Sequence, residues 1–212
     1  MKSIRIVTII GAMLASTSVL AANEFEGPWA GLGLGMRGTV TKISDSQGNS
    51  IDSLGKDSVF GILQGGYGFR WDTSLGAFNL GPYLFYYLGN VDSDTRTIGG
   101  VNAMTRWKNQ WGLGLQPGYF VSRDTLVYLK AGFNQVTLEV NASNASGQIS
   151  PSDQFSGPAI GLGMKHQFSS DWTIFVDTWE VFYGSKDYTI GSSTITLRPR
   201  MVMGQFGFGY QF

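Results

Sequence analysis

The one histidine of the chain is the first candidate for acid–base chemistry. His166 is followed closely by Ser169 and Asp171. A base, a nucleophile and an orienting carboxylate within a few residues are what a lipid-modifying esterase would need. The surrounding residues alternate with a period of two, however, which turns His166 to the outside of a strand and leaves Ser169 and Asp171 in a turn. We therefore predict no catalytic residue, and interpret His166 as an outward-facing side chain.

A glycine pattern is the second candidate, for cofactor binding. Gly33, Gly35 and Gly38 satisfy the dinucleotide pattern G-x-G-x-x-G, and Asp57 follows at about the 20-residue distance of the ribose-binding carboxylate. That mechanism requires a helix to begin at the glycines, so that its N-terminus can hold pyrophosphate. Here the period-two alternation continues through them. We predict no cofactor and no metal ion.

A third group consists of charged residues in the alternating segments. They lie on the face of each expected strand that also carries Gly, Gln and Asn. They are Arg37, Arg106, Lys108, Lys130, Lys165 and Asp177. Small and charged residues cannot face lipid, so we expect this set to face an enclosed lumen, where the charges must pair with one another or with water. The excess of cations leaves open a narrow anion path or a bound anion.

The elements that position these residues are short alternating segments that predict an all-β fold. They begin near residues 30, 59, 78, 106, 127, 157, 172 and 194. Long polar connections (42–57, 91–104, 141–154 and 184–193) alternate with short turns near 71–76, 122–125 and 169–171. This pattern is typical of an antiparallel transmembrane β-barrel of eight strands. The alternation is interrupted near Pro82, Gln135 and Glu180, and at Gln135 either a bulge or a strand running past the bilayer would explain it.

The closing stretch shows the alternation most clearly. Phe206, Phe208, Tyr210 and Phe212 share one face, opposite Gln205 and Gln211, so the aromatic row is predicted to face lipid. Counting back from the terminus places Arg198 and Arg200 at the outer rim, since a tilted strand crosses the bilayer in about 9–11 residues. These arginines are candidates for contact with lipopolysaccharide phosphates, and solvated arginines at the base of a loop are the alternative.

Composition agrees with export to a membrane. Residues 1–21 read as a signal peptide with Lys2 and Arg5 before a short apolar stretch, although a membrane-anchor helix is the alternative, and residues 22–212 would then form the barrel. Apolar residues make up 42% of the chain, with 30 glycines and no cysteine. The nearly balanced charge argues against nucleic acid as a partner. Stability must come from hydrogen bonding and burial rather than from disulfides.

At this point the chain resembles the eight-stranded outer-membrane β-barrel family that includes the opacity-type and Omp25/Omp31-type surface proteins. The stretches that carry the resemblance are the opening Phe25-Glu-Gly-Pro-Trp-Ala-Gly-Leu-Gly-Leu-Gly35, Leu126-Val-Tyr-Leu-Lys-Ala-Gly132, Gly157-Pro-Ala-Ile-Gly-Leu-Gly-Met-Lys165, Trp172-Thr-Ile-Phe-Val-Asp177 and the aromatic terminus. The resemblance implies a bacterial outer-membrane location. It also implies that Phe208, Tyr210 and Phe212 form the signal recognised by the barrel-assembly machinery.

Three functions stay open from the sequence. The first is a non-enzymatic, monomeric barrel whose four exposed loops serve surface interaction, adhesion or envelope integrity, with a host or envelope partner. The second is a small anion-preferring channel or ligand carrier that uses the cationic lumen. The third is a lipid-modifying outer-membrane enzyme. Loop sequences carry no code that identifies their partner.

Overall fold

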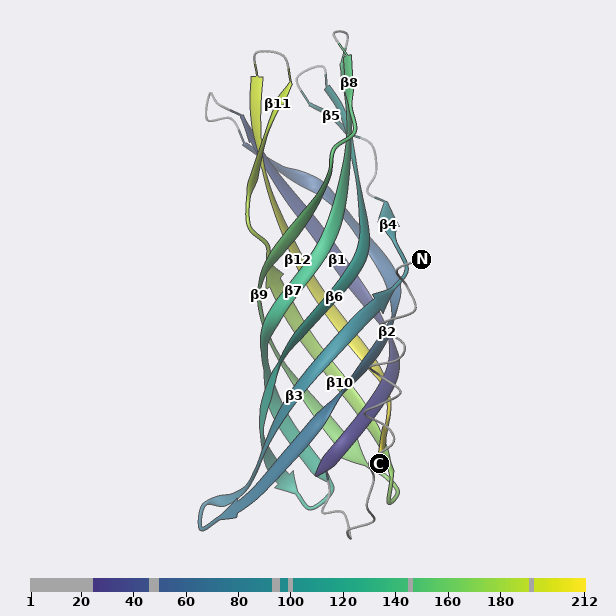
Figure 1. Ribbon diagram of the computed structural model, residues 1–212, viewed down its shortest axis with the longest axis vertical. Helices are drawn as coiled ribbons and strands as arrows, with labels where there is room; N and C mark the ends of the chain where they lie inside the picture. Colours follow the sequence, from purple (N-terminus) through teal and green to yellow (C-terminus); the bar gives the residue numbers. More distant parts are fainter. Residues whose placement is uncertain (1–24, 46–49, 93–95, 99–100, 145–146, 191–192) are drawn as a thin grey trace, which may run out of the picture.

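The computed structural model describes residues 25–45, 50–92, 96–98, 101–144, 147–190 and 193–212. The predicted signal peptide, residues 1–21, lies outside these ranges. Within them, eight long strands form one closed antiparallel barrel, which confirms the predicted fold class (Figure 1). The same ranges contain no helix long and apolar enough to cross a membrane.

Each long strand pairs with its neighbours in the chain, and the first and last strands close the barrel. The long strands are β1 (Gly27–Asp45), β2 (Ser50–Thr73), β3 (Gly76–Leu88), β6 (Val101–Ser122), β7 (Thr125–Asn144), β9 (Ser152–Gln167), β10 (Trp172–Phe182) and β12 (Ser193–Gln211). The short strands β4 (Val91–Asp92), β5 (Arg96–Ile98), β8 (Gly147–Ile149) and β11 (Lys186–Ile190) pair with β6, β7 or β12.

The two ends of the barrel differ. Tight turns join β2 to β3 and β6 to β7 at one end, here called the short-turn end, where β12 also finishes. Long hairpins that carry β5, β8 and β11 project from the other, the hairpin end (Figure 1). Much of the sequence predicted as loop is therefore strand. Residues of the predicted loop 42–57, for example, form a ladder in which Lys42 lies opposite Asp52.

Outward-facing side chains form an apolar belt around the short-turn half of the barrel. Large exposed side chains include Leu32, Leu34, Leu63, Leu113, Leu129, Ile160, Leu162, Val176, Phe206 and Phe208. Gln205 and Gln211 are buried inside the barrel, so the predicted faces of the closing strand are confirmed. Since a soluble protein rarely exposes a continuous apolar surface of this extent, the belt is the part of the wall that meets lipid.

Toward the hairpin end the polarity of the two faces of the barrel wall is exchanged, so that apolar residues face inward and polar residues face outward. In β7, Val136, Leu138 and Val140 are buried inside the barrel, whereas Gln135, Thr137 and Glu139 lie outside. The ladder between β7 and β9 continues without a register shift through this region. The change near Gln135 is therefore a strand running past the bilayer, and no bulge occurs in β7. Above the apolar belt the barrel resembles a soluble one, apolar within and polar outside.

A bulge occurs instead in β6 and corrects one part of the predicted lumen set. Lys108 lies opposite Thr137 and Trp111 opposite Gln135, so Asn109 and Gln110 share one partner residue, and Asn109 has φ 49°. The extra residue reverses the faces above it. Arg106 and Lys108 consequently lie on the outer surface, and Trp107 between them is fully buried inside.

The other two interruptions leave the register intact. The ladder between β2 and β3 skips the residues beside Pro82, which has no N–H to donate, and resumes with the same register. In β10 the ladder with β12 runs through Glu180, so Trp179 and Val181 face inward and Glu180 outward. Phe60 and Ile62 of β2 are buried lumen residues as well.

Candidate functional site

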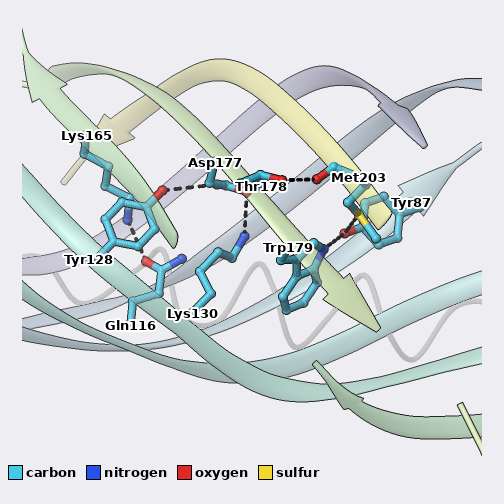
Figure 2. Close-up of polar contacts among 9 residues, drawn as sticks. All are labelled: Tyr87, Gln116, Tyr128, Lys130, Lys165, Asp177, Thr178, Trp179 and Met203. Carbon is cyan, nitrogen blue, oxygen red and sulfur yellow. Dashed lines mark hydrogen bonds and ion pairs between the residues drawn. The ribbon is translucent and has the colours of Figure 1, made fainter. Parts of the chain in front are cut away.

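A buried ion pair lies at the centre of the lumen. Lys130 of β7 donates a hydrogen bond to Asp177 of β10, with Nζ and Oδ1 3.0 Å apart and both side chains completely buried. Tyr128 donates to the other carboxylate oxygen at 3.1 Å (Figure 2). The Lys130 ammonium also lies 4.6 Å from the ring centre of Trp179. Asp177 is thus paired with Lys130, as expected of charges that share the lumen.

Glycines of β9 allow this approach across the barrel. A Cβ on Gly163 would lie 2.5 Å from the Asp177 Cβ and 2.6 Å from the Tyr128 ring. A Cβ on Gly161 would lie 2.2 Å from Trp179. The glycine-rich inner face predicted from the sequence therefore serves to admit large side chains from the neighbouring strands.

A second polar cluster surrounds Arg37 of β1. Its guanidinium donates to Gln110 Oε1 at 2.7 Å and to the Gly89 carbonyl oxygen at 3.2 Å. Gln110 donates in turn to the Tyr183 hydroxyl, which itself donates to Asn134. Arg37 has no carboxylate partner in these contacts, so its charge is stabilised by neutral acceptors. Gln110, Tyr183 and Asn134 belong to this site but were not singled out from the sequence.

Large side chains pack around this cluster and fill the lumen beside it. Trp179 donates to the Tyr87 hydroxyl at 2.9 Å, and Tyr87 donates to the sulfur of Met203 (Figure 2). These residues belong to one buried apolar cluster that also includes Phe60, Phe85, Trp107, Val136, Leu138, Val181 and Leu197. Interior packing at this density opposes an open pore.

The described residues contain no cluster of histidine, cysteine and carboxylate side chains that could hold a metal ion. His166 faces outward from the short-turn end of β9, where its Nδ1 lies 3.0 Å from the Thr125 hydroxyl. Ser169 and Asp171 lie in the adjoining turn and are exposed. These placements agree with the sequence reading of all three residues.

The family model for the outer membrane protein beta-barrel domain matches residues 7–212. The chain belongs to this family. It is therefore a bacterial outer-membrane β-barrel protein, and by the usual asymmetry of such barrels the short-turn end is periplasmic and the hairpin end extracellular.

Solved structures with the same fold are distant in sequence. OprG from Pseudomonas aeruginosa is 15% identical with a TM-score of 0.59, and the match covers 90% of this chain and 98% of that one. AlkL, solved in lipid bilayers, is 14% identical with a TM-score of 0.52, covering 93% and 95%. The outer-membrane protease OmpT from Escherichia coli is 8% identical with a TM-score of 0.50, covering 93% and 100%. No curated protein sequence matches the chain significantly. At these identities the similarity shows the fold alone.

Ion pairs surround the extracellular part of the barrel. The bulge turns two cations outward, and each has a carboxylate partner there. Arg106 pairs with Asp92, and Lys108 pairs with Glu139 at 2.7 Å. Arg200 pairs with Glu180 and lies over the Phe182 ring. Arg198 is exposed on the same outer face of β12.

One carboxylate connects two hairpins. Asp153 of β9 accepts from Lys186 Nζ at 2.9 Å and from the Tyr188 hydroxyl at 2.8 Å, both on β11. These two hydrogen bonds, first that from Lys186, hold the pKa of Asp153 below its usual value. At this level the backbone of β9 pairs with β7, and the backbone of β11 pairs with β12. The side-chain contact at Asp153 therefore holds the β11–β12 hairpin against β9 where the two have no backbone hydrogen bonds to each other in these ladders.

Proposed function

We propose that this protein is a non-enzymatic, monomeric surface protein, and that the strand extensions outside the membrane are its binding region for a host or envelope partner. The single observation that carries the proposal is the inversion of polarity above the apolar belt. An apolar core continues inside the barrel where lipid no longer surrounds it, so the extracellular strands form a packed platform rather than loose connections.

Packing inside the lumen favours this proposal over a channel or carrier. The side chains that fill the barrel, among them Trp107, Trp179 and Leu138, are fully buried, and the cations Lys130 and Arg37 are engaged by Asp177 and Gln110. Planar-bilayer recording decides between the two functions. A stable anion-selective current from the purified protein would favour the channel, and its absence is expected here.

Truncation of one hairpin at a time tests the platform. For the β11–β12 hairpin, residues 188–195 are replaced by Asn-Gly, which suits a two-residue turn between the paired residues Asp187 and Thr196. The other hairpins are shortened in the same way. Binding of the variants to epithelial cells and to immobilised matrix protein is compared with wild type, with heat-modifiable migration on gels as the control for folding. At least one folded variant should lose binding; retention by all of them would refute the proposal.

We also propose that Arg198 and Arg200 contact lipopolysaccharide phosphates. Both arginines are exposed on the outer face of β12, and Arg200 lies two positions nearer the apolar belt than Arg198. Arg200 also pairs with Glu180. A guanidinium binds phosphate in a bidentate manner, and the two side chains lie at the level expected for the lipid headgroups. Replacement of both arginines by alanine should reduce lipopolysaccharide that copurifies with the barrel, whereas Arg123→Ala at the periplasmic turn should not. Unchanged copurification in the double variant would rule out the contact.

The enzymatic alternative is tested by lipid turnover. Lipid A and phospholipids from cells that overproduce the protein are compared with those from cells that produce His166→Ala. We expect the same lipid composition in both. Modified lipid that depends on His166 would restore the enzymatic reading.

A further inference from the structure

The barrel wall separates into two strand edges at its extracellular end, between β9 and β11. Lower down, β10 pairs with β9 as far as Val181 and Ala159. One further hydrogen bond joins the two backbones, from the Gly184 N–H to the Ser156 carbonyl oxygen at 3.0 Å. Beyond it the chain continues as β11, which pairs with β12, and the β11–β12 hairpin projects separately from the hairpin that carries β8 (Figure 1). The gap between β9 and β11 is here called the seam.

On the β9 side, the seam exposes backbone groups without a partner. The N–H and C=O groups of successive residues in an antiparallel strand point to opposite neighbours. Since the Ser156 carbonyl points toward β10 and β11 and meets Gly184 there, the backbone groups of Ser152 and Gln154 point into the seam as well. Both residues are exposed, and in the described part of the chain these groups have no backbone partner.

The β11 side of the seam has the same property. The Gln211 N–H of β12 donates toward the start of β10, and the ladders of β12 run without a register shift, so its odd-numbered residues point toward β10 and β11. Ile195 is therefore hydrogen-bonded to Tyr188 opposite it, and the backbone groups of Asp187 and Thr189 point into the seam. These two residues are also exposed. The seam thus has two antiparallel edges that face each other.

The width of the seam suits one additional strand. Paired strands lie about 4.8 Å apart, so two edges that hold one strand between them are about 9.6 Å apart. β9 and β11 do not approach along their length at the spacing of paired strands, and side chains span the distance instead. Lys186 Nζ meets Asp153 at 2.9 Å, a contact between one long and one short side chain across the gap. This bridge keeps the two edges facing each other.

The inner side of the seam is largely apolar. Phe155 is buried, and the Lys186 ammonium lies 5.3 Å from its ring centre. Tyr188 packs against the buried apolar cluster of the upper lumen. Every second side chain of an added strand would face these residues, and the others would face water. An extended segment with apolar or aromatic residues at alternate positions fits this surface.

We propose that the seam binds an extended segment of a protein partner, which joins the sheet as a strand between β9 and β11. The inference rests on the proposed function and specifies the partner class of the platform: a polypeptide recognised mainly through its backbone. The unpaired N–H and C=O groups of Ser152, Gln154, Asp187 and Thr189 provide the hydrogen bonds, and the apolar inner side selects among sequences.

Random ten-residue peptides displayed on phage are the probe. The full barrel in lipid nanodiscs selects peptides, and the affinity of each synthesised peptide is measured by fluorescence anisotropy. Thr189→Pro removes an N–H that points into the seam and leaves the groups that bond β12 in place. It should weaken binding at least about fivefold, as expected for one lost hydrogen bond. Thr189→Ala keeps this N–H and should bind as wild type does. Gln154→Pro and Gln154→Ala form the same matched pair on β9.

Backbone N-methylation of the selected peptides supplies a second readout. In an inserted strand one N–H points to β9 and the next to β11. Methylation at either of two successive central residues should therefore weaken binding. Unchanged affinity at one of them would overturn insertion between the two edges. This measurement, with heat-modifiable migration as the folding control, also decides the question if a proline variant fails to fold.

Failure of this inference is distinguishable from failure of the proposed function. Selection of no peptide, or affinities that are unchanged in both proline variants, would overturn binding at the seam even if truncation of the β11–β12 hairpin abolishes binding to cells. Peptide binding that both proline variants weaken, combined with truncations that leave binding to cells unchanged, would keep the seam as a peptide site and refute the platform.

Discussion

Replacement of Asp177 by asparagine tests whether the buried ion pair stabilises the barrel. The two side chains have nearly the same shape. Lys130 donates to Oδ1 and Tyr128 to Oδ2 of the carboxylate, so the single carbonyl oxygen of the introduced amide keeps one of these acceptor positions. The substitution removes the one negative charge that faces Lys130 in a completely buried pair, together with one acceptor. Any loss of stability therefore reports the charge and its hydrogen bonding and not a cavity.

The expected loss is about 3–5 kcal/mol in the free energy of unfolding, because breaking a buried pair leaves the remaining charge uncompensated. Arg37 and Lys165 increase the cost, since both are buried cations in the same lumen. Replacing Lys130 by methionine in addition removes that charge. The double variant should therefore recover to within about 1 kcal/mol of wild type, since a buried pair replaced by neutral groups is often close to neutral.

Urea titration of the barrel in lipid vesicles measures all four members of this double-mutant cycle. Tryptophan fluorescence reports unfolding, and heat-modifiable migration on gels confirms insertion. The reasoning requires a coupling energy of at least about 2 kcal/mol between positions 130 and 177. A loss below about 1 kcal/mol for Asp177→Asn, or no recovery in the double variant, would refute it.

Three further predictions concern other parts of the barrel. Trp179→Ala should cost about 3–5 kcal/mol by leaving a cavity beside Phe85 and Tyr87, measured by the same titration, with lipid-facing Phe208→Ala as the milder control. The pKa of Asp153 is lowered in the folded protein, so its contacts stabilise the β11–β12 hairpin fully above the ordinary carboxyl pKa. This stabilisation is lost as the pH falls through the lowered pKa, and hydrogen exchange of the β11 amides should become faster in that pH range. Asp153→Asn should show the same faster exchange at neutral pH. Deletion of Phe212 should impair insertion in cells while binding by the inserted fraction persists, and normal insertion would disprove its role as an assembly signal.

The sequence predicted the strands in the membrane because one rule governs them. Between lipid and a narrow lumen, alternation of bulk and small or polar residues is forced, and Phe206, Phe208 and Tyr210 obey it against Gln205 and Gln211. The strand order also follows, since each antiparallel strand pairs with the next along the chain. The charged lumen residues Arg37, Lys130, Lys165 and Asp177 lie inside for the same reason.

Predictions failed where the surroundings of the wall change from lipid to water. Polar residues of 42–57 were assigned to a loop, although a strand in water is polar on its outer face. Arg106 and Lys108 were placed inside because counting from Trp111 takes no account of the extra residue at Asn109. A signal was present there, since Lys108-Asn-Gln110 is a run of polar residues within an alternating segment, and asparagine tolerates the positive φ of a bulge.

The same strand therefore has two environments, and a given substitution should have opposite effects on either side of their boundary. In β7, Leu129 faces lipid and Gln135 faces water, with both side chains on the outer face. Arginine at Leu129 should cost about 2–4 kcal/mol if that residue lies near the bilayer midplane, whereas arginine at Gln135 should cost little. For inward-facing positions the order of the costs is reversed. A charge introduced at Leu138 would meet the apolar cluster without a partner and should cost much stability, whereas the lumen beside Lys130 already contains the carboxylate of Asp177 and accommodates a charge. The boundary near Gln135 thus separates the part of the wall that holds the protein in the membrane from the part whose outer face meets water. Under the proposed function, this second part is the binding platform, and substitutions on its outer face should change binding while the barrel stays folded.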